Sequence, residues 1–365
     1  MFRATFSDYK PCFLNYEEIM NPFKVLRNTF QDASSAESII DECWDIWTVA
    51  FRSDYWTTYE SPRVLYERFL KLARLLDAGW LVSQIRPSYL TKGKVIKPGY
   101  NPKKTDDSNR FKGELIEAFR TMGKFYNESS RFDLVFDLYG VFYQGLMPTS
   151  WDFEIFLKES AYFSFQKINQ LILALYVVCN AKEEAISEKD KPRLAEFTNA
   201  GLDHNTPQFD YYDCIDNIFE SFNKTQFFSI VEYLKNISSE HCYWKYNGNP
   251  ANVLYYMEEL QFVMEILWSF AKEFNEKDSR EWKIPKKAKK QIKHLPNHAL
   301  KNPLKFVSQE FEKRSLSERR KDIEEWRLAT LDNKWHNYDT YRDIQNFLLR
   351  MIEIADLLEY QPTNY

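Results

Sequence analysis

The sequence predicts an all-α protein, and three observations lead to this prediction. Apolar residues recur at three- and four-residue spacing through most of the chain, which is the periodicity of an amphipathic helix. Strict alternation of apolar and polar residues, the pattern of a half-buried strand, is sustained nowhere. Only 9 of the 365 residues are glycine, too few for many hairpin turns or phosphate-binding loops.

Four long helices are predicted from apolar stripes in the sequence. The first stripe follows Ser61-Pro62 and the third follows Asn249-Pro250. Proline is favoured in the first turn of a helix, so each pair predicts a helix start. The fourth stripe lies behind Asp343. The stripes in order are Val64/Leu65/Phe69/Leu72/Leu75/Leu76, Phe165/Ile168/Leu171/Ile172/Leu175, Val253/Leu254/Met257/Leu260/Val263/Met264/Leu267 and Ile344/Phe347/Leu348/Met351/Ile352/Ala355.

A weak internal repeat suggests an irregular array of about four divergent three-helix units, each closed by one of these helices. Each unit opens with apolar residues at i and i+3 and phenylalanine at i+7, and a second helix with bulky side chains follows. The openings are Phe23/Leu26/Phe30, Val135/Leu138/Phe142, Ile215/Ile218/Phe222 and Leu304/Val307/Phe311. Their spacing is uneven, so divergent duplication and coincidence both stay open. With 17% aromatic residues, the helix interfaces are expected to be bulky.

Breaks in the helical pattern predict the domain organisation. Residues 1–180 form an N-terminal helical region with units one and two, and a surface loop rich in lysine and arginine is expected at residues 91–112. Unit three spans residues 181–282. A basic linker at residues 283–303 separates it from unit four at residues 304–365.

Charge and cysteine usage narrow the function class. The net charge is 49 − 53 = −4, too small to predict a partner from the field of the whole chain. The longest apolar run, residues 171–179, is shorter than the roughly 20 residues of a membrane span, so no membrane partner is expected. Five cysteines without a C-x-x-C pair predict neither a disulfide framework nor a zinc ribbon. We expect a cytoplasmic protein, or a nuclear one if the source is eukaryotic.

The sequence contains no motif for catalysis, and neither a cofactor nor a metal is predicted. Glycine-rich nucleotide fingerprints and a nucleophile elbow are absent. His294 and His298 have the spacing of one helical face, but Pro296 lies between them and lysines surround them. His241 and Cys242 are neighbours, and neighbouring positions on a helix do not face each other. An enzyme with an aromatic cleft in a helical fold stays open as a second alternative.

The leading hypothesis is a non-enzymatic interaction or scaffold protein that binds a protein or peptide partner through aromatic helical surfaces. The segment at residues 243–249 carries three closely spaced rings, from Tyr243, Trp244 and Tyr246, and aromatic side chains are favoured at interfaces. These three residues are the candidate partner-binding residues. The competing interpretation is that the segment folds over the hydrophobic core.

The first alternative is a nucleic-acid-binding accessory protein that uses the segment at residues 283–305. This segment contains eight lysines and no acidic residue, which suits sequence-independent contacts to phosphates. Residues 285–290 also resemble a short nuclear-import signal. The candidate nucleic-acid-binding residues are Lys286, Lys287, Lys289, Lys290 and Lys293.

Overall fold

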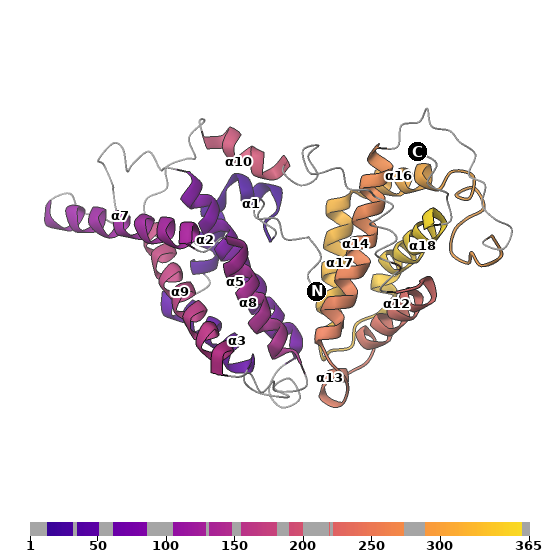
Figure 1. Cartoon of the computed structure of the whole chain (residues 1–365), viewed down its shortest axis with the longest axis horizontal. Helices are drawn as coiled ribbons and strands as arrows, with labels where there is room; N and C mark the ends of the chain where they lie inside the picture. The colour runs from indigo at the N-terminus through magenta and orange to yellow at the C-terminus, as the bar shows by residue number, and fades with distance from the viewer. Residues whose placement is uncertain are drawn as a thin grey trace. The chain divides into compact units, whose positions relative to one another are not determined.

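A computed structural model describes residues 13–31, 35–50, 61–85, 105–128, 131–147, 155–180, 190–199, 219, 222–273 and 289–359 of the chain. Within these residues it contains fourteen α-helices, a short 3-10 helix and no strand (Figure 1). The all-α prediction is confirmed. The arrangement of the helices as four repeated units stays a prediction.

The chain forms two compact units. The first contains residues 1–55 and 64–203, and the second contains residues 56–63 and 204–365. Helix α5 begins at Pro62, so its first two residues are grouped with the second unit and the rest with the first. The predicted boundaries at residues 181, 283 and 304 stay predictions.

In the first unit, α9 packs along four other helices, which are α2, α3, α7 and α8 (Figure 1). The short α1 contacts both α2 and α10. The helices are α1 (Tyr16–Met20), α2 (Pro22–Gln31), α3 (Ala36–Ala50), α5 (Pro62–Gln84), α7 (Thr105–Glu128), α8 (Arg131–Gly145), α9 (Ile155–Cys179) and α10 (Asp190–Asn199).

Aromatic side chains fill the core of the first unit, as the composition predicts. The rings of Phe69 on α5 and Phe142 on α8 stack with centroids 4.6 Å apart and an interplanar angle of 10°. Tyr66 and Tyr139 pack against the same pair of rings. Offset-stacked and edge-on pairs of this kind contribute about 0.5–1.5 kcal/mol each beyond their buried area.

Gly79 permits the close approach of α5 to α9. A Cβ atom built at this position would lie 2.7 Å from Leu175 Cδ2 and 2.7 Å from the hydroxyl of Tyr126. Leu175 is fully buried, and the Tyr126 hydroxyl donates a hydrogen bond of 2.8 Å to the carbonyl of Leu76. Neither group can move aside easily, so glycine is required here by the packing.

The loop predicted at residues 91–112 is partly wrong. Helix α7 begins at Thr105, so residues 105–112 are helical, while residues 91–104 lie outside the described residues. The sequence places threonine at position 105 and aspartates at 106 and 107, residue types that favour the start of a helix. The prediction extended the loop to residue 112 because it rested on the lysines and prolines before residue 105.

In the second unit, α18 contacts α12, α14, α16, α17 and η1, and α14 runs beside α17 (Figure 1). Side chains of Asn223, Asn302 and Ser315 cap the starts of α12, α16 and α17. The elements are α12 (Lys224–Ser238), α13 (Tyr243–Tyr246), α14 (Ala251–Glu273), α16 (Pro303–Lys313), α17 (Leu316–Thr330), η1 (Tyr338–Tyr341) and α18 (Arg342–Glu359).

The carboxyl-terminal half of α18 is enclosed on all sides. Every residue from Met351 to Leu358 is buried, and the stretch includes the acidic residues Glu353 and Asp356. Lys224 at the start of α12 forms an ion pair with Asp356. Because a buried charge without a partner is very costly, both carboxylates need compensating groups in the folded protein.

Candidate functional site

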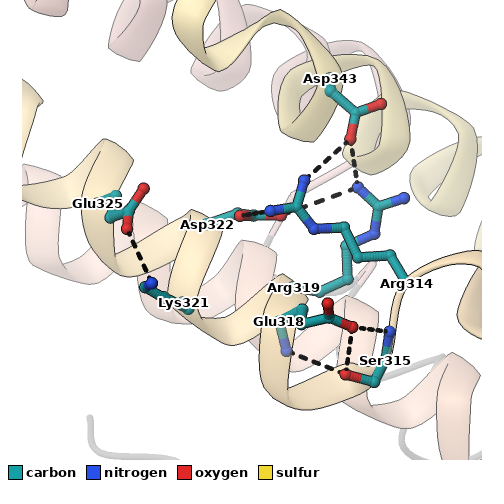
Figure 2. Close-up of polar contacts among 8 residues, drawn as sticks. All are labelled: Arg314, Ser315, Glu318, Arg319, Lys321, Asp322, Glu325 and Asp343. Atoms are coloured by element: carbon teal, nitrogen blue, oxygen red, sulfur yellow. Dashed lines mark hydrogen bonds and ion pairs between the residues drawn. The ribbon is translucent and has the colours of Figure 1, made fainter.

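A cluster of four charged side chains joins α16, α17 and α18 (Figure 2). We call Arg314, Arg319, Asp322 and Asp343 the charge quartet. Arg314 donates a hydrogen bond to Asp322, and Nη1 of Arg319 lies 2.7 Å from Oδ2 of Asp343. Two longer contacts complete the cluster. Arg314 Nη1 lies 3.7 Å from the carboxylate of Asp343, and Arg319 Nη1 lies 4.0 Å from that of Asp322.

The charge quartet is electrically balanced and partly buried. The guanidinium of Arg319 lies 4.1 Å from the centre of the Phe347 ring, and its side chain is buried. Burial raises the pKa of Asp322, against the opposing effect of the two arginines. Two cations and two carboxylates leave no surplus charge to attract a substrate ion, so the quartet is best explained as a connection between three helices.

A capping box lies beside the charge quartet. Ser315 caps α17, and its Oγ accepts a hydrogen bond from the amide of Glu318 (Figure 2). The carboxylate of Glu318 in turn accepts hydrogen bonds from Ser315 Oγ at 2.6 Å and Ser315 N at 2.8 Å. The side-chain hydrogen bond, followed by the backbone one, lowers the pKa of Glu318.

His241 and Cys242 come together, contrary to the prediction. Cys242 Sγ lies 2.8 Å from His241 Nδ1, because Cys242 has a left-handed backbone conformation with φ of 57° and the chain is not helical there. An activated cysteine nucleophile needs a base that is itself oriented by a third group. Among the described residues, no third group orients His241.

The other two described cysteines are Cys43, which is buried, and Cys179, which is half-buried. Burial raises the pKa of the Cys43 thiol, and burial also raises that of Cys179, to about 11. Such thiols are protonated and unreactive near neutral pH. No group of three or more His, Cys, Asp or Glu side chains suited to a metal ion occurs in the part of the chain that the structure describes.

The aromatic segment folds partly into the core. Trp244 is fully buried, and its Nε1 donates a hydrogen bond of 2.8 Å to the carbonyl of Thr330. Its ring therefore belongs to the packing of the second unit. Tyr243 is half-buried, whereas Tyr246 is 74% exposed. Partner binding by this segment stays a prediction, and the exposed Tyr246 is the side chain available for it.

The structure places three of the five candidate lysines. Lys289, Lys290 and Lys293 are exposed, and Lys286 and Lys287 lie outside the described residues. His294 and His298 are also exposed, and each ring packs edge-on against a phenylalanine, Phe228 and Phe306 respectively.

An exposed stripe on α9 was not predicted from the sequence. The exposed positions from residue 162 to residue 180 are all uncharged. They are Tyr162, Phe163, Gln166, Gln170, Leu173 and Asn180. Residue periodicity places the first five on one face of the helix, opposite the buried residues Ile168, Leu171 and Leu175. We call these five residues the α9 stripe. From residue 162 to residue 173 the face opposite the predicted core stripe carries no charged residue, and this is the sequence signal that would have found it.

Comparisons with known protein families, curated protein sequences and solved structures found no match to this chain. Among the helices that the structure describes, none has both the length and the apolar character that crossing a bilayer requires.

Proposed function

We propose that this protein is a non-enzymatic interaction protein that binds an amphipathic helix of a protein partner through the α9 stripe. The observation that supports this proposal is that three large apolar side chains of the stripe are exposed. Phe163 is 61% exposed, Tyr162 51% and Leu173 47%. Exposed apolar side chains gathered on one helical face mark interaction surfaces, whereas isolated ones are ordinary.

The lack of charge strengthens this proposal. Charged residues make up 28% of the chain, and the solvent side of a helix normally carries many of them. The α9 stripe has none, and Gln166 and Gln170 separate its apolar side chains. A partner surface with little charge and apolar anchors would complement it best.

The dimensions of the stripe suit a helix. Tyr162 and Leu173 are separated by eleven residues, or about 16 Å along the helix axis, which corresponds to about three turns. An amphipathic partner helix presents anchors at i, i+3, i+4 and i+7 over this length. Phe136 on α8 and Ile116 on α7 are also exposed, and both helices pack against α9.

The test compares two charge-matched variants. Phe163→Glu with Leu173→Glu places two negative charges in the stripe, and Asn28→Glu with Asn127→Glu places two on exposed positions of α2 and α7. Tagged wild-type and variant proteins would be used for capture from nuclease-treated native lysate, with circular dichroism as the check on folding. We expect a protein that the wild type and the control capture to be lost from the stripe variant.

Photo-crosslinking identifies the bound surface directly. A photoreactive phenylalanine analogue at position 162 should crosslink to the captured protein, and mass spectrometry of the product should place the link in a helical segment of that partner. Retention of the same partners by the stripe variant, without a crosslink from position 162, would contradict the proposal.

A further inference from the structure

The second unit carries a fixed loop with a strong positive charge. We call residues 289–305 the basic loop, which ends with the first turn of α16. It contains five lysines and no acidic residue. All five are exposed, and none forms an ion pair with a described residue. The five are Lys289, Lys290, Lys293, Lys301 and Lys305.

A buried carboxylate of α18 holds this loop in place. Glu353 is fully buried and accepts hydrogen bonds from three successive backbone amides. Its oxygens lie 2.6 Å from the amide of Lys293, 2.9 Å from that of His294 and 2.8 Å from that of Leu295. Hydrogen bonds to a charged acceptor are about twice as strong as neutral ones, so this is a firm anchor.

Further contacts fix the rest of the loop. Leu295 and Ala299 are buried, and the amide of Ala299 donates a hydrogen bond of 2.9 Å to the carbonyl of Pro296. At the end of the loop, Asn302 Oδ1 accepts a hydrogen bond of 3.0 Å from the amide of Lys305 and caps α16. The backbone that carries the lysines is therefore already ordered, so less conformational entropy is lost on binding.

The positive charge of the basic loop is not cancelled by the carboxylates beside it. On the helices that contact or carry the loop, Glu232 pairs with Lys235, Glu310 with Lys313 and Arg350, and Asp356 with Lys224. Glu353 is buried and directed at backbone amides. The exposed Glu312 of α16 is one acid against five lysines.

We propose that the basic loop binds the phosphate backbone of nucleic acid, with Glu353 as the residue that positions it. Several closely spaced lysines without interspersed acids match the repeating charge of a phosphodiester chain. Among the apolar side chains of the loop, Leu295, Ala299 and Leu304 are buried and Ile292 and Leu300 are half-buried, so none is exposed for insertion into a lipid surface. The site lies in the second unit and does not depend on the α9 stripe.

Salt dependence provides the quantitative test. On duplex DNA, each phosphate contact contributes about −0.9 to the slope of log K against log salt concentration. The triple variant Lys289→Gln, Lys290→Gln, Lys293→Gln removes three contacts, so the slope should become shallower by about 2.7. Binding would be measured by fluorescence anisotropy of a fluorescein-labelled DNA duplex of mixed sequence and of its single strand, over a range of KCl concentrations.

The control variant changes the same net charge elsewhere in the second unit. Lys245→Gln, Lys321→Gln and Lys334→Gln alter three exposed lysines outside the basic loop. This variant should keep the wild-type salt slope. An equal loss of slope in both triple variants would show that binding follows net charge alone, and would overturn the assignment to the basic loop.

Glu353→Gln separates positioning from charge. The substitution removes a negative charge, which by itself would favour binding to DNA. If the anchor positions the loop, affinity should instead fall about three- to tenfold, with a nearly unchanged salt slope. Hydrogen exchange at the amides of residues 293–295 should accelerate in parallel. Unchanged or stronger binding by this variant, with the fold intact, would refute the positioning role.

Two further probes identify other binding partners. Vesicles of mixed phosphatidylcholine and phosphatidylserine test a lipid surface, and polyglutamate tests an acidic protein segment. Binding of either probe without binding of the duplex or the single strand would overturn the proposal. The α9 stripe variant should bind the duplex normally, so failure of one proposal is distinguishable from failure of the other.

Discussion

Helices α9 and α18 are both long and rich in apolar residues, but they differ in where charged residues are buried or missing. The last turns of α18 are buried on every side and still contain Glu353 and Asp356. Helix α9 exposes one face to solvent and has no charged residue at its exposed positions between residues 162 and 180. Each helix reverses the usual rule that charge lies outside and apolar surface inside.

The difference shows how exceptions to that rule can be interpreted. The two buried carboxylates of α18 have defined partners, a run of backbone amides for Glu353 and Lys224 for Asp356. They therefore connect α18 to other parts of the second unit. The exposed apolar residues of α9 have no such explanation within the described structure, and this makes the helix a candidate for binding a partner.

The largest expected effect is loss of the Glu353 anchor. Glu353→Ala leaves three amides without an acceptor, one of them on the buried Leu295. We expect the free energy of unfolding to fall by about 3–5 kcal/mol, since each unsatisfied buried donor costs about 1–3 kcal/mol. Urea denaturation would measure it. A loss below about 1 kcal/mol would mean that water replaces the carboxylate and that the anchor is weak.

The Lys224–Asp356 pair tests the second buried carboxylate of α18. Both side chains are largely buried, so Lys224→Met should leave an uncompensated charge and cost about 3 kcal/mol. The double variant Lys224→Met with Asp356→Leu should recover most of this stability, because it removes both charges. Together with the single variant Asp356→Leu, these proteins form a double-mutant cycle on the free energy of unfolding. A double variant that is less stable than the single one would argue against an unpaired charge as the cause.

The two faces of α9 should respond differently to truncation. Leu175→Ala empties a fully buried site next to Gly79 and should cost about 2–5 kcal/mol. Leu173→Ala alters an exposed residue of the stripe and should change stability by about 0.5 kcal/mol or less. Thermal or urea unfolding of the two variants gives the comparison. Equal losses would show that the stripe is covered in the isolated protein.

A smaller effect than the loss of a buried side chain concerns the capping box of α17, and it depends on pH. The pKa of Glu318 is lowered in the folded protein, so its ionised form stabilises the fold above pH about 4.5 and loses this contribution as pH falls through the folded-state pKa. Ser315→Ala should return the pKa of Glu318 toward its ordinary value, as measured by NMR titration. Loss of the N-cap hydrogen bond costs about 1 kcal/mol. An unchanged pKa would show that Ser315 is not its cause.

The fold class and several helices could be predicted from the sequence. Pro62 and the stripe behind it predict a helix, and α5 spans Pro62–Gln84. The same holds for Ala251–Glu273 after Pro250 and for Arg342–Glu359 around Asp343. These predictions rest on local periodicity and helix-start residues, which depend on neighbours only a few positions away.

The candidate sites could be predicted only in part. The lysines of residues 283–305 are visible in the sequence, but their fixed loop depends on Glu353, which lies about sixty residues further along the chain. Trp244 and Tyr246 are alike in sequence terms, yet one is fully buried and the other is largely exposed. Burial depends on which helix packs against the residue, and a pattern of residue types does not contain that information.

The sequence by itself determined the helical periodicity, the helix starts and the accumulation of lysines, because each of these is set by residues close together in the chain. Only the tertiary structure decided which carboxylates are buried, which aromatic rings reach solvent and which side chains hold the basic loop. These properties arise from contacts between distant segments, such as that between Glu353 and residues 293–295. Such contacts form only when helices that are distant in the sequence pack together, and this packing decides which face of each helix is buried.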